Sequence, residues 1–266
     1  MNTSNAHFNI RPASQSQIKL WRKLQFKKYR EQEGLYLVSG WRAVETFLFS
    51  AKQIVEAIIV SDEQRPNLGR LNTEPDQPIF SVPVKDFTRI SEERQPQGIA
   101  LVARIRAYDV QSKPPREDHL VYLDRISDPG NLGTIIRSAA WFGIQTLLLS
   151  PHSADPFQPK VVRSSVGGIG QVNIYQNVDV SQLKKLTGKL KYTAIASIIG
   201  NGQAAEKLRN LSDKKVMLLL GSEAHGLTSE LIDLCQIKVS IPQPGFGESL
   251  NLSAAAAILF YLLCTN

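Results

Sequence analysis

The second half of the chain alternates between short, almost wholly apolar segments and segments in which apolar residues have helical spacing. The apolar segments are residues 120–124, 145–150, 172–175, 192–197, 215–221 and 237–241, and the helical segments are residues 131–142, 158–166, 181–190, 203–210 and 228–235. Strands that are apolar on both sides and separated by helices are typical of a parallel sheet covered on both faces. The pattern therefore predicts an α/β domain over residues 120–266.

The first half predicts a smaller α/β domain over residues 31–106. Its expected strands are residues 34–40, 54–61, 78–82 and 98–105, and its expected helices are residues 41–51 and 84–91. Residues 107–119 are polar and contain a Pro-Pro pair, which is typical of a linker. A chain of 266 residues with 42% hydrophobic content can bury a sufficient core without a disulfide or metal staple.

Residues 1–30 form a basic N-terminal extension. They contain no acidic residue, and their basic residues are Arg11, Lys19, Arg22, Lys23, Lys27, Lys28 and Arg30. The spacing of Ile18, Trp21 and Leu24 predicts a helix over residues 16–30. The whole chain has a net charge of +7, and these seven basic residues account for it, so the remaining 236 residues are close to neutral. Charge alone leaves two interpretations, a site for a polyanion such as nucleic acid or a solvated helix face.

The cysteines and the longest apolar run bear on metal binding and location. Cys235 and Cys264 lie in apolar stretches and form no C-x-x-C pair, so we expect buried thiols and no metal site. The N-terminus lacks a charged and apolar leader, and the run from Ala254 to Cys264 is shorter than the about 20 residues that span a bilayer. We therefore expect a cytoplasmic protein without a membrane partner.

Three loops that follow predicted strands are candidates for a site, because ligands of a parallel α/β sheet bind at the carboxyl ends of its strands. The first loop is "DPGNLGTIIRSAAWFG", residues 128–143. Asn131 can cap the helix that follows, and Arg137 can meet a phosphate or a developing oxyanion at the loop end of the sheet. Taken alone, this stretch is better explained as a capped helix with a surface arginine.

The second loop lies in "LLLGSEAHGL", residues 218–227, where a buried strand precedes a glycine-rich turn with Glu223 and His225. It matches neither the G-x-G-x-x-G dinucleotide fingerprint nor a G-K-[ST] phosphate loop, and "VGGIGQ", residues 166–171, fails the same tests. We interpret His225 as a loop residue rather than a catalytic base.

The third loop lies in "IPQPGFGESLNLSAAAAI", residues 241–258. A stretch punctuated by proline and glycine precedes the turn Ser249-Leu250-Asn251, and Asn251 or Ser253 can cap the final helix. That helix is apolar on nearly every face, so we expect it to be buried on two sides.

Taken together and in this order, the three loops resemble those of the SpoU (TrmH) family of RNA ribose 2'-O-methyltransferases, within the SPOUT superfamily. The resemblance covers residues 120–264, and the matching residues are Asn131, Gly133 and Arg137 in the first motif, Gly221, Glu223 and Gly226 in the second, and Ile241, Pro242, Gly245, Ser249, Leu250 and Asn251 in the third. Residues 31–105 resemble the family's small substrate-binding domain, which is similar to RNA-binding ribosomal proteins. Gln243 departs from the family, which often has methionine there.

The resemblance implies a fold, a cofactor and a partner. The implied fold is a parallel sheet whose C-terminal segment forms a deep trefoil knot, with the final helix packed against a second copy of the chain in a homodimer. The implied cofactor is the methyl donor S-adenosylmethionine. By analogy, its binding residues are Ser197, Leu219, Gly221, Ile241, Pro242 and Leu250.

The implied reaction transfers a methyl group to a ribose 2'-hydroxyl of RNA. The implied catalytic residues are Arg137, Asn131, Glu223, Ser249 and Asn251, with Glu223 and Asn131 orienting Arg137 and the loops and Asn251 holding the third loop. In the family, the arginine of one subunit is expected to act as the base beside the other subunit's cofactor. A guanidinium seldom deprotonates, so an alternative is that Arg137 holds a phosphate and stabilises the alkoxide while Ser249 or water relays the proton.

The RNA partner is the least defined part of the resemblance. The expected RNA-binding residues are Lys19, Arg22, Lys23, Lys27, Lys28, Arg30 and Arg42. The two-domain layout favours 23S ribosomal RNA, with transfer RNA, methylation of a base nitrogen, or a non-catalytic role in ribosome assembly as the alternatives.

Overall fold

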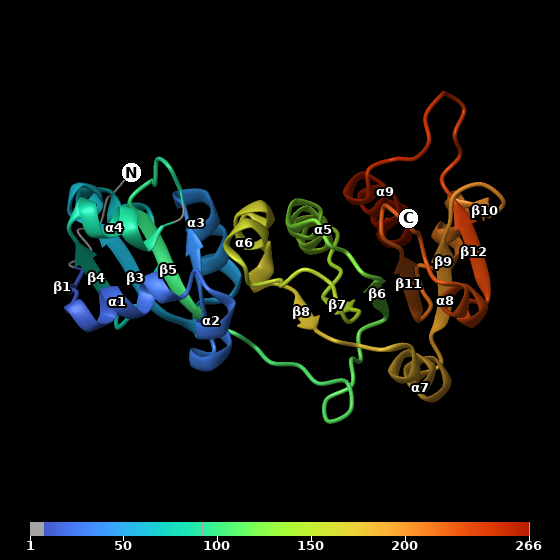
Figure 1. Ribbon diagram of the computed structural model, residues 1–266, viewed down its shortest axis with the longest axis horizontal. Helices are drawn as coiled ribbons and strands as arrows, with labels where there is room; N and C mark the ends of the chain where they lie inside the picture. The colour runs from blue at the N-terminus through green and yellow to red at the C-terminus, as the bar shows by residue number, and fades with distance from the viewer. Residues whose placement is uncertain (1–7, 92, 266) are drawn as a thin grey trace. The chain divides into compact units, whose positions relative to one another are not determined.

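The computed structural model in Figure 1 describes residues 8–91 and 93–265, and the chain divides into two compact units. The first unit takes in the described residues up to Arg106 together with Phe157–Gln171. The second takes in Ala107–Pro156 and the described residues from Val172 onward. The first seven residues of the predicted basic extension lie outside the described residues. No helix within the described ranges is long and apolar enough to span a membrane.

The first unit contains a five-stranded mixed sheet in the order β1-β4-β3-β5-β2. Its strands are β1 (Ile10–Pro12), β2 (Leu35–Ser39), β3 (Val55–Ser61), β4 (Ile79–Val82) and β5 (Ile99–Arg104). Its helices are α1 (Gln15–Lys23), α2 (Lys27–Glu33), α3 (Trp41–Ser50), α4 (Val84–Ile90) and α6 (Pro159–Ser165), with the 3-10 segments η1 (Lys52–Ile54), η2 (Asp62–Arg70) and η3 (Gly168–Gly170). The strands and helices predicted between residues 34 and 105 are confirmed to within one residue, whereas β1 was not predicted.

The basic segment forms two helices, so the single helix predicted over residues 16–30 is wrong. A capping box between Ser14 and Gln17 begins α1, and Phe26 adopts an extended backbone conformation before α2. The Arg30 guanidinium donates hydrogen bonds to the carbonyls of Leu24 and Gln25, at 2.8 and 2.7 Å. These bonds satisfy carbonyls that the end of α1 leaves without helical partners, and they stabilise the break.

The amphipathic helix α1 is part of the core of the first unit rather than a detached extension. Its apolar residues pack with α4 against one face of the sheet, in a cluster that includes Ile18, Trp21, Leu24, Ile59, Phe87, Ile90 and Val102. At about 25 cal/mol per Å² of apolar surface, such burial supplies most of the stability of a helix this short. The basic residues of α1 are left on its outer side.

The glycine-rich segment "VGGIGQ" has a packing role in the first unit. A side chain at Gly167 would overlap the backbone at Ala43, and one at Gly170 would overlap the ring of Phe47. Gly167 also has a φ of +83°, which favours glycine. The glycines therefore let η3 approach α3 closely.

The second unit contains a seven-stranded sheet in the order β10-β12-β9-β11-β6-β7-β8, in which every pair is parallel. Its strands are β6 (His119–Leu123), β7 (Thr146–Leu149), β8 (Asn173–Tyr175), β9 (Thr193–Ser197), β10 (Gln203–Ala204), β11 (Val216–Leu220) and β12 (Ile237–Ser240). Its helices are α5 (Pro129–Trp141), α7 (Val180–Leu190), α8 (Ser229–Leu234), α9 (Leu252–Cys264) and the 3-10 helix η4 (Ala205–Leu211). The α/β architecture with a parallel sheet is confirmed. The helix predicted over residues 203–210 is instead β10 followed by η4.

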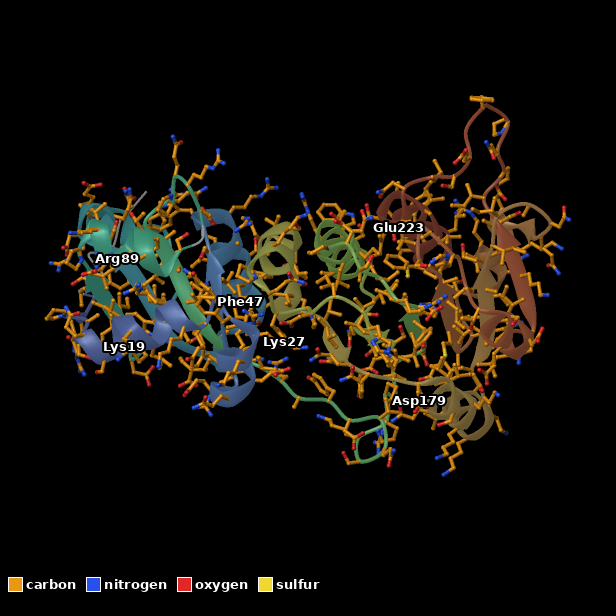
Figure 2. The ribbon with its side chains drawn as sticks, in the orientation of Figure 1. Lys19, Lys27, Phe47, Arg89, Asp179 and Glu223 are labelled. Atoms are coloured by element: carbon orange, nitrogen blue, oxygen red, sulfur yellow. The ribbon has the colours of Figure 1, made fainter. Side chains whose placement is uncertain are left out.

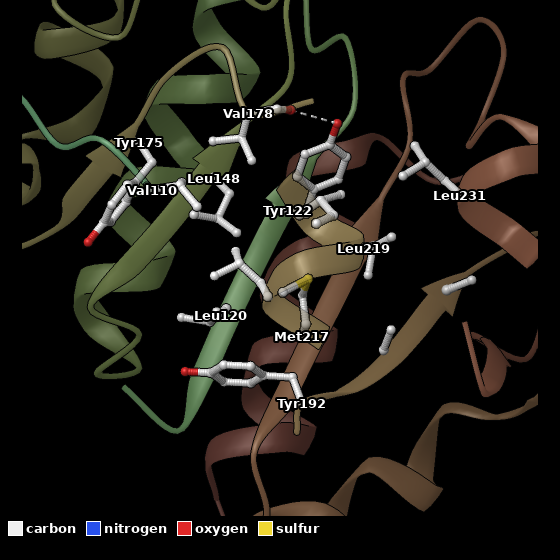
Figure 3. Packing of buried hydrophobic residues seen from close by; sticks show 14 of the residues in the cluster. Val110, Leu120, Tyr122, Leu148, Tyr175, Val178, Tyr192, Met217, Leu219 and Leu231 are labelled. Atoms are coloured by element: carbon white, nitrogen blue, oxygen red, sulfur yellow. Dashed lines mark hydrogen bonds between the residues drawn. The ribbon is translucent and has the colours of Figure 1, made fainter. Parts of the chain in front are cut away.

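Helices cover both faces of this sheet. Figure 3 shows the face under α7 and α8, where Leu120, Tyr122, Met217 and Leu219 pack with Leu231. Side chains alternate along a strand, and on the opposite face α9 packs against α5 and η4. Residues 107–119, predicted as a linker, contribute Tyr108 and Val110 to the core region of the second unit. In this single chain, the outer side of α9 remains exposed at Ile258 and Tyr261.

Candidate active site

The predicted motifs converge at the carboxyl edge of the seven-stranded sheet. Strands β12, β9, β11 and β6 are consecutive neighbours in the sheet and all run in the same direction. Ile241 follows β12, Ser197 ends β9, and Gly221 follows β11, while the loop after β6 leads into α5. Segments far apart in the sequence therefore present their loops along one edge, as expected for a ligand site in a parallel α/β sheet.

The first motif begins α5, but its cap is Asp128 rather than the predicted Asn131. The Asp128 carboxylate accepts a hydrogen bond from the backbone N–H of Asn131 at 2.7 Å, and Pro129 occupies the first turn. An Asp-Pro pair before an apolar helix is a typical helix start, so this cap could have been predicted from the sequence. Because Asp128 caps the helix, the side chain of Asn131 is available for other contacts.

Asn131 joins the other two motifs through its side-chain amide. Its Nδ2 donates to the carboxylate of Glu223, and its Oδ1 accepts a hydrogen bond of 3.0 Å from Nδ2 of Asn251. We call Glu223, Asn131 and Asn251 the amide relay. The relay links the loop after β11, the start of α5 and the start of α9, and Figure 2 shows Glu223 beside α9. Both ends of the Asn131 amide are therefore satisfied in one orientation.

Asn251 also caps the final helix, as predicted. Its Oδ1 accepts hydrogen bonds from the backbone N–H groups of Ser253 and Ala254, at 2.9 and 3.3 Å. The same side chain thus starts α9 with its oxygen and joins the relay with its nitrogen. Its loss removes a cap and a contact between motifs together.

The glycine-rich loop after β11 depends on close backbone packing. A side chain at Gly221 would overlap the backbone of Gly226 and Leu227. The backbone N–H of Gly226 donates a hydrogen bond to the Ser222 backbone carbonyl at 2.8 Å. His225 is exposed in this turn, which fits its interpretation as a loop residue. The turn presents Glu223 to the side-chain amide of Asn131.

Two polar residues directly after β6 support this loop, and no role was predicted for them from the sequence. The Arg125 guanidinium forms an ion pair of 3.1 Å with the buried Asp124 carboxylate and donates to the Gly226 carbonyl at 3.5 Å. The backbone N–H of Arg125 donates to the Ser150 hydroxyl at 2.6 Å. A charged pair directly after a buried strand was the available signal, since it falls at the carboxyl edge of the sheet.

Arg137 lies on α5 but is not part of the relay. Six residues along an α-helix correspond to a rotation of about 240° and a rise of about 9 Å, so Arg137 and Asn131 lie on different faces of α5. The assignment of Arg137 to a phosphate or an oxyanion at the loop end of the sheet stays a prediction. Arg137 is exposed, and its side chain has no hydrogen-bond or ion-pair partner within the described part of the chain.

The predicted cofactor-binding residues differ in exposure. Ser197, Gly221 and Ile241 are half-buried at the strand ends, whereas Pro242 and Leu250 are exposed in the loop after β12. Leu219 is fully buried in the core below α7 and α8. Ser249 is exposed in the same loop as Leu250. The Gln243 side chain donates to the Gly247 carbonyl and closes the tip of this loop.

The predicted RNA-binding residues lie in the first unit, and most of them are accessible. Lys19, Arg22, Lys27, Lys28 and Arg42 are exposed and Lys23 is half-buried, with Lys19 and Lys27 labelled in Figure 2. The prediction that Arg30 binds RNA is wrong, because its side chain is only 3% exposed and donates hydrogen bonds to backbone carbonyls. Among residues 8–91 and 93–265, no cluster of three or more His, Cys, Asp or Glu side chains could hold a metal ion.

Known protein families match both halves of the chain. Residues 118–261 match the SpoU rRNA Methylase family, and residues 15–101 match the MRM3-like substrate binding domain. The second match begins within α1, so it includes both basic helices.

Individual proteins match over nearly the whole length. The chain is 31% identical to the 23S rRNA (guanosine(2553)-2'-O)-methyltransferase RlmP of Bacillus subtilis, over 96% of this chain and 98% of that protein. It superposes on the structure of a TrmH-family protein from Porphyromonas gingivalis with a TM-score of 0.79 and 29% identity, covering 94% and 98% of the two chains. It also shares its fold with the SpoU methyltransferase AviRb of Streptomyces viridochromogenes in complex with AdoMet, with a TM-score of 0.77, 24% identity and coverage of 94% and 97%.

Proposed function

Because the chain belongs to the SpoU rRNA methylase family and is an RNA 2'-O-methyltransferase that uses S-adenosylmethionine, we propose that its substrate is 23S ribosomal RNA. The support is the Bacillus subtilis relative, whose name specifies 23S rRNA and which aligns over both units. A substrate-binding domain matched over residues 15–101 further supports a large RNA partner. A cytoplasmic location follows from this substrate and is part of the proposal.

The proposed S-adenosylmethionine site is the carboxyl edge of the sheet at β9, β11 and β12. The residues fit the cofactor, because the adenine is uncharged and can be read by backbone groups at Ser197, Gly221 and Ile241. Pro242 and Leu250 are exposed apolar side chains suited to its ring. Leu219 would support the end of β11 from the core. When bound, S-adenosylmethionine supplies a sulfonium methyl group for in-line displacement.

The amide relay is the single observation that carries the catalytic assignment. It joins all three motifs by side-chain hydrogen bonds, although Asn131 and Asn251 are 120 residues apart in the sequence. In our proposal, the relay holds Ser249 and the loop after β12 so that the ribose hydroxyl can be aligned with the methyl group. Alignment of this kind can supply several kcal/mol of the activation free energy.

We assign Arg137 to the developing alkoxide and the adjacent phosphate of the RNA. A guanidinium keeps its proton in proteins and presents a planar fork of donors, which suits anion binding better than proton abstraction. The proton then leaves through Ser249 or water, while the family's assignment of Arg137 as base is the competing mechanism. Because Arg137 is exposed and is not joined to the relay of its own chain by those hydrogen bonds, we propose that it completes the site of a second subunit.

The proposed partner for this purpose is a second copy of the chain. Trp141 at the end of α5 is 84% exposed, and Ile258 and Tyr261 on α9 are 38% and 48% exposed. The ring centroids of Phe142 and Tyr261 are 6.2 Å apart, so these residues form one apolar surface across α5 and α9. Exposed apolar surface of this kind marks an interface, and its place beside Arg137 on α5 supports a homodimer. We also propose that α9 closes the trefoil knot characteristic of this fold class.

The proposed RNA grip is the outer side of the basic helices in the first unit. Lys19, Arg22, Lys23, Lys27 and Lys28 would neutralise phosphates, with Arg42 as a further contact on α3. Arg30 is excluded from this set because it is buried. The two units therefore divide the work into RNA binding and methyl transfer.

The function is tested with labelled S-adenosylmethionine and RNA from cells that lack this gene. Ribosomal and transfer RNA are separated and digested with alkali, because a 2'-O-methyl group makes the adjacent linkage resistant. We expect label in an alkali-resistant dinucleotide from 23S rRNA. Label in transfer RNA, or on a base, would reassign the substrate, and no label from folded dimeric protein would favour a non-catalytic assembly role.

A further inference from the structure

The turn between α1 and α2 exposes one aromatic side chain in the middle of the basic cluster. Phe26 is 62% exposed, although a phenylalanine is normally buried. Arg22 and Lys23 precede it, and Lys27 and Lys28 follow it. We propose that Phe26 is a base-stacking residue through which the first unit binds an unpaired nucleotide of the RNA. The inference rests on the proposed function, because it deepens the RNA grip.

The backbone around Phe26 is held in place by the side chains of Arg30 and Gln25. Arg30 donates to the carbonyls of Leu24 and Gln25, and Nε2 of Gln25 donates to the carbonyl of Ile90 at 2.8 Å. A buried arginine in a positively charged segment is thus used to fix this turn rather than to contact solvent. The turn is therefore anchored both to α2 and to α4.

Phe26 itself has both backbone groups paired. Its N–H donates to the Lys23 carbonyl at 2.9 Å, and its carbonyl accepts from the N–H of Tyr29 at 3.1 Å. The ring of Phe26 is therefore the part of the residue that remains available to a partner. A ring presented on a fixed backbone loses little conformational entropy when it binds, which is the advantage of a preorganised contact.

The positive charges that flank Phe26 in the sequence favour RNA as its partner. Nζ of Lys23 lies 4.8 Å from the centroid of the Tyr29 ring, and Nζ of Lys27 lies 3.6 Å from the Glu31 carboxylate. Cations that follow a phosphate backbone, combined with an exposed ring on which a base can stack, are the usual elements of single-strand recognition. A base inside a duplex has no free face for this contact, so the site selects an unpaired nucleotide.

The test compares Phe26→Ala with Phe49→Ala, a matched control on α3 of the same unit whose side chain is 84% exposed. The probe is a fluorescein-labelled, unstructured RNA of about 12 nucleotides, used alone or annealed to its complement. Because one stacked base is worth about 1–3 kcal/mol, we expect Phe26→Ala to weaken single-strand binding about tenfold and duplex binding less than twofold. Phe49→Ala should change neither, and Phe26→Tyr should bind nearly as tightly as the natural chain.

Two further measurements separate stacking from other roles. Phe26→Trp should show indole fluorescence that is quenched by the single strand, and Phe26→Leu should bind as weakly as Phe26→Ala. Equal binding by Phe26→Ala and the natural chain, or full binding by Phe26→Leu, would overturn the inference.

The methyl-transfer assay distinguishes this inference from the proposed reaction. Phe26→Ala should raise KM for RNA about tenfold with little change in kcat. If the natural chain transfers methyl groups and Phe26→Ala has the same KM, the inference fails and the reaction stands. If the natural chain transfers none but binds the single strand through Phe26, the reaction fails and the inference stands.

Discussion

The two units place their polar residues in different ways. In the second unit, all seven strands are parallel, so loops from distant parts of the sequence meet at one edge and their side chains bind one another. In the first unit, the sheet is mixed, and five exposed basic residues lie on α1, α2 and α3, namely Lys19, Arg22, Lys27, Lys28 and Arg42. A convergent site depends on all its members, whereas a charged helix surface is a sum of separate contacts. We therefore expect substitutions in the second unit to have large, non-additive effects on methyl transfer. Substitutions of the basic residues in the first unit should have small, additive effects on RNA binding.

The largest effect is expected from Arg137→Ala. Loss of a group that stabilises a developing negative charge lowers kcat by about 100- to 1,000-fold, with S-adenosylmethionine affinity and Tm unchanged. Methyl transfer under saturating RNA measures it, and Arg116→Ala, an exposed arginine of the same unit, is the control. Activity within threefold of the natural chain would remove Arg137 from the mechanism. Arg137→Lys with retained activity and a shifted pH profile would count against a need for the planar fork.

Mixing two impaired variants tests whether Arg137 acts across the dimer. In a heterodimer of Arg137→Ala and Asn251→Ala chains, one site combines intact loops with an intact arginine from the other subunit. Random reassociation makes about half of the dimers mixed, so we expect recovery of about one quarter of natural activity. An arginine that served its own chain's loops would leave both sites of the heterodimer inactive, and no recovery would follow.

The amide relay should behave as one unit. Asn131→Ala and Asn251→Ala should each lower kcat/KM by about 10- to 100-fold, and the double variant should be no worse than the weaker single variant. Asn251→Ala should also cost about 1 kcal/mol in the free energy of unfolding, because it removes the cap of α9. Kinetics and denaturant unfolding of all four proteins complete the cycle. Additive losses would show that the contacts between motifs act separately.

The basic helices should show the opposite behaviour. Lys19→Ala and Lys28→Ala should each weaken RNA binding about two- to fivefold, and each should lower the slope of log Kd against log salt by about 0.7 for a single strand. The double variant should show the sum in both quantities. Lys189→Ala, an exposed lysine of the second unit, is the control and should change neither. If all three substitutions weakened RNA binding equally, the RNA would not bind specifically at the basic helices.

The smallest effect is expected at the amino edge of the parallel sheet. Burial lowers the pKa of His119, and the opposing effect of the Asp118 carboxylate is outweighed. The folded chain then binds fewer protons than the unfolded chain, so stability is present above about pH 6.5 and declines as pH falls below it. Tm should fall between pH 7.5 and 5.5, and His119→Asn should reduce that fall without changing methyl transfer at pH 7.5. An unchanged slope would assign the dependence to other groups.

The difference between the units also explains how much could be predicted from the sequence. Apolar strands predicted the parallel sheet, and polar residues after those strands predicted the edge at which Asn131, Glu223 and Asn251 meet. The role of Arg30 could not be predicted, because charge gives no indication that a side chain turns inward to cap α1. Likewise, contacts between "VGGIGQ" and α3 depend on packing between residues more than 100 positions apart.

Methylation of a 23S rRNA ribose by this enzyme can be checked by mapping ribose methylation in living cells. Ribosomal and transfer RNA would be compared between cells with the natural gene, cells without it, and cells with Arg137→Ala. We expect one 2'-O-methyl position in 23S rRNA to be lost both in the deletion and in Arg137→Ala. Unchanged 23S rRNA with a position lost from transfer RNA, or a position retained in Arg137→Ala, would contradict it.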